Sequence, residues 1–248
     1  GELLMANVLV EETSLSNIAS AIREKSGGSA TYKPGEMAAA ISNLPIGGSS
    51  DNENLIVTRP DNMNVTYVNH EIERIGNRVF QQWTNIGGYG LVGVDCSNVR
   101  TIGDFAFYND FLLTSVNFPK VTAIREDAFD KCTHLPTINL PMCNFVGNYG
   151  LSNCTALTKV DLGNGSNSNS PTLRYRCFWN NENMTALILR GNEVFTNEGE
   201  ILGRYSTDYN GYIYVPQALL SNYKTATNWA ELSHKIRAIE DYPNITGG

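Results

Sequence analysis

The residues that could perform catalytic or metal chemistry are few, and their spacing favours neither. His70, His134 and His234 lie far apart in the sequence, whereas a zinc site needs clustered ligands at short spacing. Adjacent acids could serve a glycosidase only if two carboxylates faced one cleft and one had a raised pKa. These pairs are Glu11-Glu12, Glu126-Asp127 and Glu240-Asp241. We interpret the histidines and acids as solvated or structural, and we predict no metal and no cofactor.

One glycine motif has the pattern of a nucleotide site but the wrong surroundings. Gly88-Tyr89-Gly90-Leu91-Val92-Gly93 fits G-x-G-x-x-G. A dinucleotide site needs a strand before this motif and a helix that opens at its end. Here the next residues, including Val94 and Cys96, read as a strand, so we interpret the glycines as a turn. No P-loop, H-E-x-x-H or G-x-S-x-G motif occurs, and we predict that the chain is not an enzyme.

The cysteines indicate packing rather than chemistry. They are five in number, so at least one thiol is not paired within the chain, and no C-x-x-C motif is present. We predict that they are small apolar core residues. They are Cys96, Cys132, Cys143, Cys154 and Cys177. The separation of 22 residues between Cys132 and Cys154 returns below as a structural period.

Composition limits the classes of partner. The chain has 248 residues, of which 42% are hydrophobic and 17% charged, and its net charge is 18 − 25 = −7. This supports a sizeable core and argues against disorder. An acidic chain has no electrostatic footprint for nucleic acid. No apolar run approaches the roughly 20 residues that span a bilayer, so we expect no membrane insertion.

An internal repeat is the strongest signal in the sequence. Five residues, mostly aromatic, align at separations of 27, 22, 22 and 27: Phe80, Phe107, Phe129, Leu151 and Phe178. Five positions before them stand Ile75, Ile102, Ile124, Val146 and Leu173. Further apolar positions recur six, nine and eleven residues after the aligned residue. Insertions in the first and fourth units account for the two longer separations. Ile213 and Val215, followed by Pro216, repeat the strand pattern and indicate a final coil.

The physical interpretation of this repeat is a solenoid. Each coil offers one short strand, such as Ser115–Phe118, whose alternation places Val116 and Phe118 inward and Ser115 and Asn117 outward. Stacked coils then form a parallel sheet with strands about 4.8 Å apart. No coil is stable alone, so both ends need caps.

The repeat sets the expected domain organisation. Residues 1–46 form a small module with two helices within residues 13–44, and residues 47–50 form a linker. These helices are too short to be stable alone, so they should pack on a partner, on the next domain or in a homo-oligomer. Residues 51–248 form the solenoid. It comprises an N-terminal hairpin cap at 51–74, coils at 75–216 and a helical C-terminal cap at 217–242, with helices at Gln217–Lys224 and Asn228–Ile239.

The repeat unit resembles that of a known family. The pattern Ile-Gly-Asp-x-Ala-Phe followed by Leu-Thr-Ser-Val-x-x-Pro, at Ile102–Pro119 and loosely at Ile124–Pro141, resembles the BspA-like leucine-rich repeat. Tyr212–Pro216 with Tyr223–Trp229 looks like the C-terminal cap common in such proteins from gut Firmicutes. Ser14–Leu44 resembles a helical module found before such repeats and in phage structural proteins. Gly150-Leu151 and Arg176-Cys177-Phe178 depart from the pattern, which predicts local irregularity there.

The resemblance implies an α/β repeat fold, a leucine-rich-repeat solenoid with a parallel sheet of short strands, preceded by the small helical module. It also implies a binding protein with no catalytic residues to carry over. We expect an extracellular protein on a bacterial cell surface or a virion. The leading hypothesis is non-catalytic adhesion or ligand binding, with host protein or glycan as partner. The alternative is a phage or prophage structural or receptor-binding protein.

The outward strand positions are the candidate ligand-binding face, because solenoids commonly bind on this extended surface. The polar part suits sugar hydroxyls or a polar protein surface, and the apolar end suits a protein or a sugar ring. A merely solvated sheet face is the alternative. The candidate residues are Asp95, Ser115, Asn117, Thr137, Asn139, Lys159, Asp161, Ile188 and Tyr214.

Overall fold

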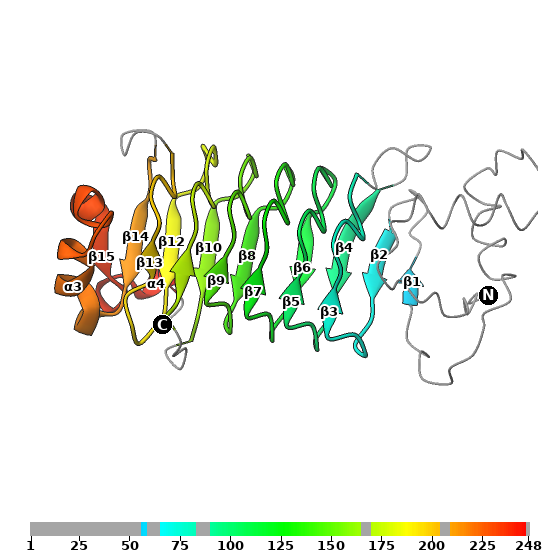
Figure 1. Cartoon of the computed structure of the whole chain (residues 1–248), viewed down its shortest axis with the longest axis horizontal. Helices are drawn as coiled ribbons and strands as arrows, with labels where there is room; N and C mark the ends of the chain where they lie inside the picture. The colour runs from blue at the N-terminus through cyan, green and yellow to red at the C-terminus, as the bar shows by residue number, and fades with distance from the viewer. Residues whose placement is uncertain (1–55, 59–64, 83–89, 165–169, 204–208, 247–248) are drawn as a thin grey trace, which may run out of the picture.

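The computed structural model describes residues 56–58, 65–82, 90–164, 170–203 and 209–246. These residues wind into an elongated solenoid whose strands stack side by side along the long axis (Figure 1). The predicted module at 1–46 and the linker at 47–50 lie outside the described residues. The predicted parallel solenoid is therefore confirmed for the repeat, while the helical module stays a prediction.

Each coil contributes a longer strand to one side of the core and a two-residue strand to the other. The longer strands are β2 (Val65–Val68), β4 (Leu91–Asp95), β6 (Ser115–Asn117), β8 (Thr137–Leu140), β10 (Lys159–Leu162), β12 (Ala186–Leu189), β14 (Tyr212–Val215) and β15 (Ile236–Ala238). The short strands form one six-stranded sheet: β3 (Arg74–Ile75), β5 (Thr101–Ile102), β7 (Ala123–Ile124), β9 (Phe145–Val146), β11 (Thr172–Leu173) and β13 (Thr196–Asn197). One short strand per coil gives six coils in the part of the chain that the structure describes.

The first coil is preceded by an antiparallel pair. Strand β1 (Ile56–Thr58) pairs with β2, with Ile56 opposite Val68. Strand β2 then pairs parallel with β4. The hairpin expected at the N-terminal end of the solenoid is present.

The core is built from the repeated apolar positions. Phe107, Phe129 and Leu151 are fully buried, and the ring of Phe107 stacks on those of Phe80 and Phe129 at centroid distances of 5.2 and 4.9 Å. Leu151 replaces the aromatic residue without disturbing the coil, since its backbone N–H still donates to the carbonyl of Cys177 at 2.8 Å. The local irregularity expected at Gly150-Leu151 and Arg176-Cys177-Phe178 is therefore wrong.

Tight turns follow the short strands, and two positions in each turn adopt positive φ. They lie two residues before and two after the aligned core residue. The first set is Arg78, Phe105, Asp127, Tyr149 and Arg176, and the second is Gln82, Asn109, Lys131, Asn153 and Asn180. This conformation costs a side-chain-bearing residue roughly 1–2 kcal/mol. Hydrogen bonds between coils offset the cost, such as that from the Phe107 N–H to the Ala128 carbonyl at 2.7 Å.

Cysteines line the inside of these turns. The Cys132 thiol donates to the Phe107 carbonyl of the preceding coil at 3.2 Å, and the Cys154 thiol donates to the Phe129 carbonyl at 3.1 Å. In the next coil the amide of Asn181 makes the equivalent bond to Leu151 at 2.8 Å. Burial raises the pKa of the Cys132 and Cys154 thiols. All five cysteines are buried and outside any disulfide, which confirms their prediction as core residues.

The longer strands form two sheets rather than one, with the break between β6 and β8. In neighbouring coils the residue before the strand donates its N–H to the previous coil, as Thr158 does to the Pro136 carbonyl at 2.8 Å. The residue after the strand does the same, as Gly163 does to Leu140 at 3.1 Å. In β8 both positions are prolines, Pro136 and Pro141, which have no N–H to donate. The two prolines therefore account for the break between β6 and β8.

The C-terminal cap combines short helices with one strand. Its elements are η2 (Gln217–Leu219), α3 (Leu220–Thr225), η3 (Ala230–Lys235), β15, η4 (Ile239–Asp241) and α4 (Pro243–Thr246). Trp229 and Tyr223 are fully buried, and the Trp229 indole donates to the Phe195 carbonyl at 2.6 Å. The predicted helix Asn228–Ile239 is wrong beyond Lys235. Strand β15 pairs parallel with β14 there, because the outer edge of β14 would otherwise leave backbone groups without partners.

The C-terminal cap also contacts the short-strand sheet, in addition to the pairing of β15 with β14. Asn197 of β13 stands where the other coils have a buried aliphatic residue, and it is itself buried. Its amide donates to the Asn228 carbonyl at 2.9 Å, and the Asn228 amide donates back to the Asn197 carbonyl at 2.7 Å. These two hydrogen bonds give the Asn197 amide and the Asn197 carbonyl, at the edge of the last coil, hydrogen-bond partners in the cap.

Candidate functional site

The candidate site is the outer face, which we define as the outward-facing side of the longer strands from β4 to β14. The strand register brings the predicted residues into two rows. In the first row Thr137 lies opposite Lys159; in the second, Asn139 lies opposite Asp161, which in turn lies opposite Ile188. At the two ends of the second row, Asp95 lies opposite Asn117 and Ile188 opposite Tyr214. Within each of the two sheets, the strand register thus aligns the predicted residues, while their role in binding stays a prediction.

The open half of the outer face comprises β4, β6 and β8 and is polar, with one carboxylate, that of Asp95. Its exposed side chains are Ser115, Asn117, Thr137 and Asn139. The Asn117 amide donates to the half-buried Asp95 carboxylate at 2.9 Å. Hydroxyl and amide groups both donate and accept hydrogen bonds. The open half can therefore bind a partner surface that presents donors, acceptors or both.

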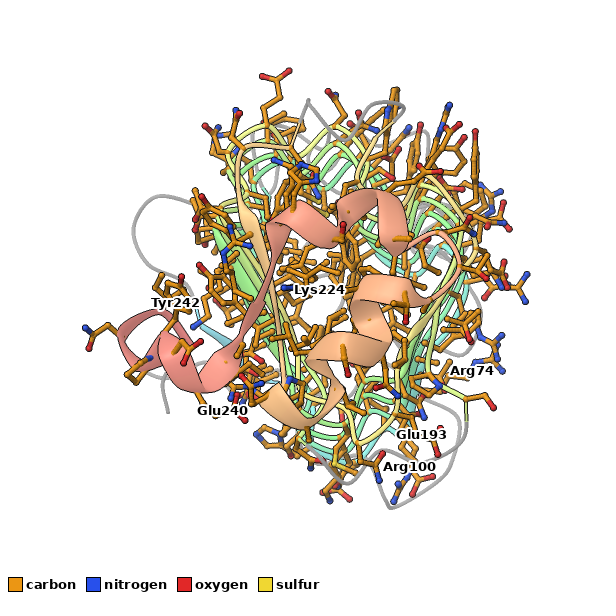
Figure 2. The ribbon with its side chains drawn as sticks, turned by 90° about the vertical axis from the view of Figure 1, so that its left-hand side faces the viewer. Arg74, Arg100, Glu193, Lys224, Glu240 and Tyr242 are labelled. Carbon is orange, nitrogen blue, oxygen red and sulfur yellow. The ribbon has the colours of Figure 1, made fainter. Side chains whose placement is uncertain are left out.

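The covered half of the outer face comprises β10, β12 and β14, and there the exposure expected from the sequence is wrong. Ala186, Ile188 and Tyr214 are 4%, 0% and 2% exposed. They form a cluster separate from the solenoid core, with Ile239 packed on it. Figure 2 shows the chain around Glu240 and Tyr242 outside the sheet on this side. Ile188 and Tyr214 are therefore not available to a ligand in this structure.

The covering segment is the C-terminal strap, which we define as residues 239–246. The ring of Tyr242 meets that of Tyr214 edge-on at a centroid distance of 5.4 Å. The Lys159 ammonium donates to the Ile245 carbonyl at 2.9 Å. At the start of the strap, the Glu240 carboxylate accepts the Gln217 N–H at 2.9 Å. The strap thus occupies Lys159 as well as covering the apolar end of the face.

Asp161 points outward, but an arginine that the sequence analysis did not select binds it. The Arg190 Nε and Nη2 atoms donate to the two carboxylate oxygens at 2.7 and 3.0 Å. These hydrogen bonds raise the pKa of Arg190. Asp161 is 6% exposed, so this bidentate pair is structural. A basic residue directly after the next strand was the signal that could have revealed it.

Exposed apolar groups occur on β14 and on the strap. Five large hydrophobic residues are exposed in the described part of the chain, and three of them, Tyr212, Tyr242 and Ile245, belong to β14 or the strap. The Arg237 guanidinium lies over the Tyr212 ring, 4.5 Å from its centroid. Tyr212 was not among the predicted residues, although it follows the row of Ser115 and Thr137.

The potential catalytic and nucleotide motifs do not converge on this face. Strand β4 begins at Leu91, directly after Gly90, so the end of the glycine motif leads into a strand and not a helix. His70 contacts Ser97, whose Oγ lies 3.0 Å from its Nδ1, and His134 contacts the Phe111 carbonyl. Within the ranges that the structure describes, no three His, Cys, Asp or Glu side chains cluster in a way that could hold a metal. No helix among the same residues has the length and apolar character needed to cross a membrane.

Parallel strands stacked on two sides of one continuous core define a solenoid repeat protein. Residues 100–200 match the BspA type leucine rich repeat region, in six copies. Residues 100–200 therefore carry BspA-type leucine-rich repeats. A sequence search of curated proteins gives no match.

Several solved structures match the chain at low sequence identity. A leucine-rich-repeat protein of T. pallidum is 18% identical with a TM-score of 0.37, over 55% of this chain and 69% of that chain. The pneumococcal vaccine antigen PcpA is 13% identical with a TM-score of 0.46, over 72% of this chain and 43% of that chain. A leucine-rich-repeat protein from Bacteroides ovatus is 18% identical with a TM-score of 0.36, over 68% and 55% respectively.

Proposed function

We propose that this chain is a non-catalytic protein-binding module that acts outside a bacterial cell, and that the open half of its outer face is the docking surface. The observation that supports this most is the arrangement of the face itself. A polar surface on β4, β6 and β8 lies beside the strap, whose Ile245 carbonyl accepts from Lys159 of β10 and whose Tyr242 and Ile245 side chains are exposed. Solenoid repeats characteristically bind partners on such extended surfaces.

The residue types suit a protein partner. Tyrosine is enriched among the residues that carry most of the binding energy in interfaces, and such anchors are surrounded by polar groups that exclude water. The open half presents hydroxyls, amides and the Asp95 carboxylate, and the strap exposes Tyr242 and Ile245. A host or bacterial protein with a polar surface and one apolar anchor would match it.

Binding assays with paired variants test the proposal. The purified chain is applied to intact epithelial cells and to immobilised extracellular-matrix proteins. We expect saturable binding that Asn117→Arg with Asn139→Arg reduces at least tenfold, because two long cations block the open half. The matched control, Thr101→Arg with Thr196→Arg, adds the same charge on the short-strand sheet and should bind like the unchanged chain. Equal losses for both variants, or binding to none of these surfaces, would refute the proposal.

The cellular site is a separate question. Attachment to the cell surface predicts that an antibody against residues 51–248 labels intact cells and that protease treatment of those cells removes the signal. The virion hypothesis predicts signal confined to purified phage particles. That alternative depends on residues 13–44, which lie outside the described residues, and the structure adds no observation in its favour.

A further inference from the structure

A cavity lies away from the outer face, on the turn side of the last two coils. Its volume is 380 Å³, within the range of small-molecule sites. Its lining includes the buried side chains of Leu202 and Tyr209 and the half-buried ring of Trp179. Asn180, Glu182 and Asn210 are exposed at its margin. The cavity therefore combines one flat ring with several hydrogen-bonding groups.

Neighbouring side chains fix the orientation of the tryptophan ring. The Tyr149 ring meets Trp179 edge-on, at a centroid distance of 6.4 Å and an interplanar angle of 82°. The Arg176 guanidinium lies 5.4 Å from the Trp179 centroid. The Glu200 carboxylate holds Arg176 through two hydrogen bonds of 2.7 and 3.0 Å. A ring that is already oriented loses little conformational entropy when a ligand binds.

The polar groups at the cavity suit hydroxyl groups better than a charged ligand. The Asn180 amide donates to Asn153 at 2.8 Å, and its carbonyl oxygen can accept a further hydrogen bond. Glu182 forms no ion pair with the part of the chain that the structure describes. The nearby cation, Arg176, is already bound to Glu200. Among the residues that the structure describes, an anionic ligand would therefore find no open cation at the cavity and would face the Glu182 carboxylate.

We propose that this cavity is a saccharide-binding subsite. The negative face of the Trp179 ring attracts the slightly positive C–H groups on one face of a pyranose ring. The Asn180 and Asn210 amides and the Glu182 carboxylate then accept or donate hydrogen bonds to the sugar hydroxyls. The subsite lies on the turn side of the solenoid, so it is independent of protein docking on the outer face.

The repeat supplies a matched control. Trp179 directly follows the aligned core residue of its coil, and Tyr108 occupies the same position three coils earlier. The Lys131 ammonium donates to the Tyr108 hydroxyl at 2.8 Å and lies 4.9 Å from its ring centroid. Tyr108 is thus an aromatic residue in the same local backbone, and it does not line this cavity.

Isothermal titration calorimetry of the full chain tests the proposal, with cellotetraose, mannotetraose and N-acetylchitotetraose as probes. We expect at least one probe to bind with a Kd below about 1 mM. Trp179→Ala should weaken that binding at least tenfold, because it removes the ring on which the sugar packs. Glu182→Gln should weaken it about threefold, because it removes a charged hydrogen-bond acceptor. Tyr108→Ala should leave it unchanged. Thermal unfolding of each variant verifies that the fold is intact.

Two results would overturn the proposal. One is the absence of heat from all three saccharides at millimolar concentration. The other is equal binding by the unchanged chain, Trp179→Ala and Glu182→Gln. Neither result bears on protein docking, because the Asn117→Arg with Asn139→Arg variant leaves the cavity untouched and is assayed against protein and cell surfaces.

Discussion

The two halves of the outer face share one backbone geometry and differ in what covers them. Strands β8, β10 and β12 are in continuous parallel register, yet Asn139 of β8 is exposed while Ile188 of β12 is fully buried. The difference comes from the C-terminal strap, which lies on the second half only. An outward position on a solenoid strand is therefore not an accessible one until the chain termini have been placed.

The comparison also separates stability from binding. In the covered half the outward side chains form a small second core with the strap. In the open half they contact mainly water and one another. Substitutions in the covered half should therefore change the free energy of unfolding, and substitutions in the open half should change only binding.

The largest expected effect is at Tyr214. Tyr214→Ala removes a buried ring that packs against Ile188 and Tyr242, so it should lower the free energy of unfolding by about 3 kcal/mol. Asn139→Ala, in the open half, should change it by less than about 0.5 kcal/mol. Urea unfolding followed by circular dichroism measures both. Equal effects would mean that the strap does not stabilise this half.

The next effect is at the Asp161–Arg190 pair. Arg190→Ala leaves a largely buried carboxylate without its two charged hydrogen bonds, which should cost about 2 kcal/mol. Adding Asp161→Asn to that variant should recover part of the loss, because the remaining group is neutral. Unfolding of the two single variants and the double variant gives the coupling energy. Additive losses would show that the bidentate pair contributes nothing to the covered half.

The smallest effect provides a reference away from both halves. Burial, with the nearby Asp130, Glu126 and Asp104, raises the pKa of Asp127 from 3.8 to about 6. The folded state therefore binds more protons than the unfolded state between these values, and stability falls as pH rises from about 4 to 6. Asp127→Asn should raise stability above pH 6, by less than about 1 kcal/mol because solvent screens this half-buried group.

The pH dependence isolates the charge effect. At pH 4 the advantage of Asp127→Asn should shrink, since Asp127 is then protonated in the folded protein. Thermal melts at pH 4.5 and 7.5 measure the difference. The variant should bind partners on the open half as the unchanged chain does. A gain that is the same at both pH values would point to the positive-φ backbone at residue 127 instead of the carboxylate charge.

The coils could be predicted from the sequence because their signal is periodic. Phe107, Phe129 and Leu151 recur at fixed separation, and each contacts only neighbouring coils, so local spacing fixes tertiary position. The outward rows followed from the same spacing. Proline at positions 136 and 141 also predicts the break between β6 and β8, once it is known that the equivalent residues of other coils donate their backbone N–H to the previous coil.

The features that the sequence did not reveal depend on contacts that occur once and do not recur from coil to coil. The strap brings Tyr242 onto Tyr214 and Ile245 onto Lys159, and nothing in the repeat specifies such a return of the chain. Arg190 reaches Asp161 across a repeat of 27 residues, five longer than the two repeats before it. Strand β15 reads as a helix from its apolar spacing, and only the open edge of β14 makes it a strand.

The most direct test of the two-halves account is the rate at which a maleimide labels a cysteine in each half. Ser115→Cys and Ala186→Cys place small thiols in the same outward row, one open and one beneath the strap. The five native cysteines are buried, so their background reaction is slow. The account predicts that the Ser115→Cys thiol reacts at least tenfold faster than the Ala186→Cys thiol. Equal rates would contradict it, because the strap would then not cover the second half in solution.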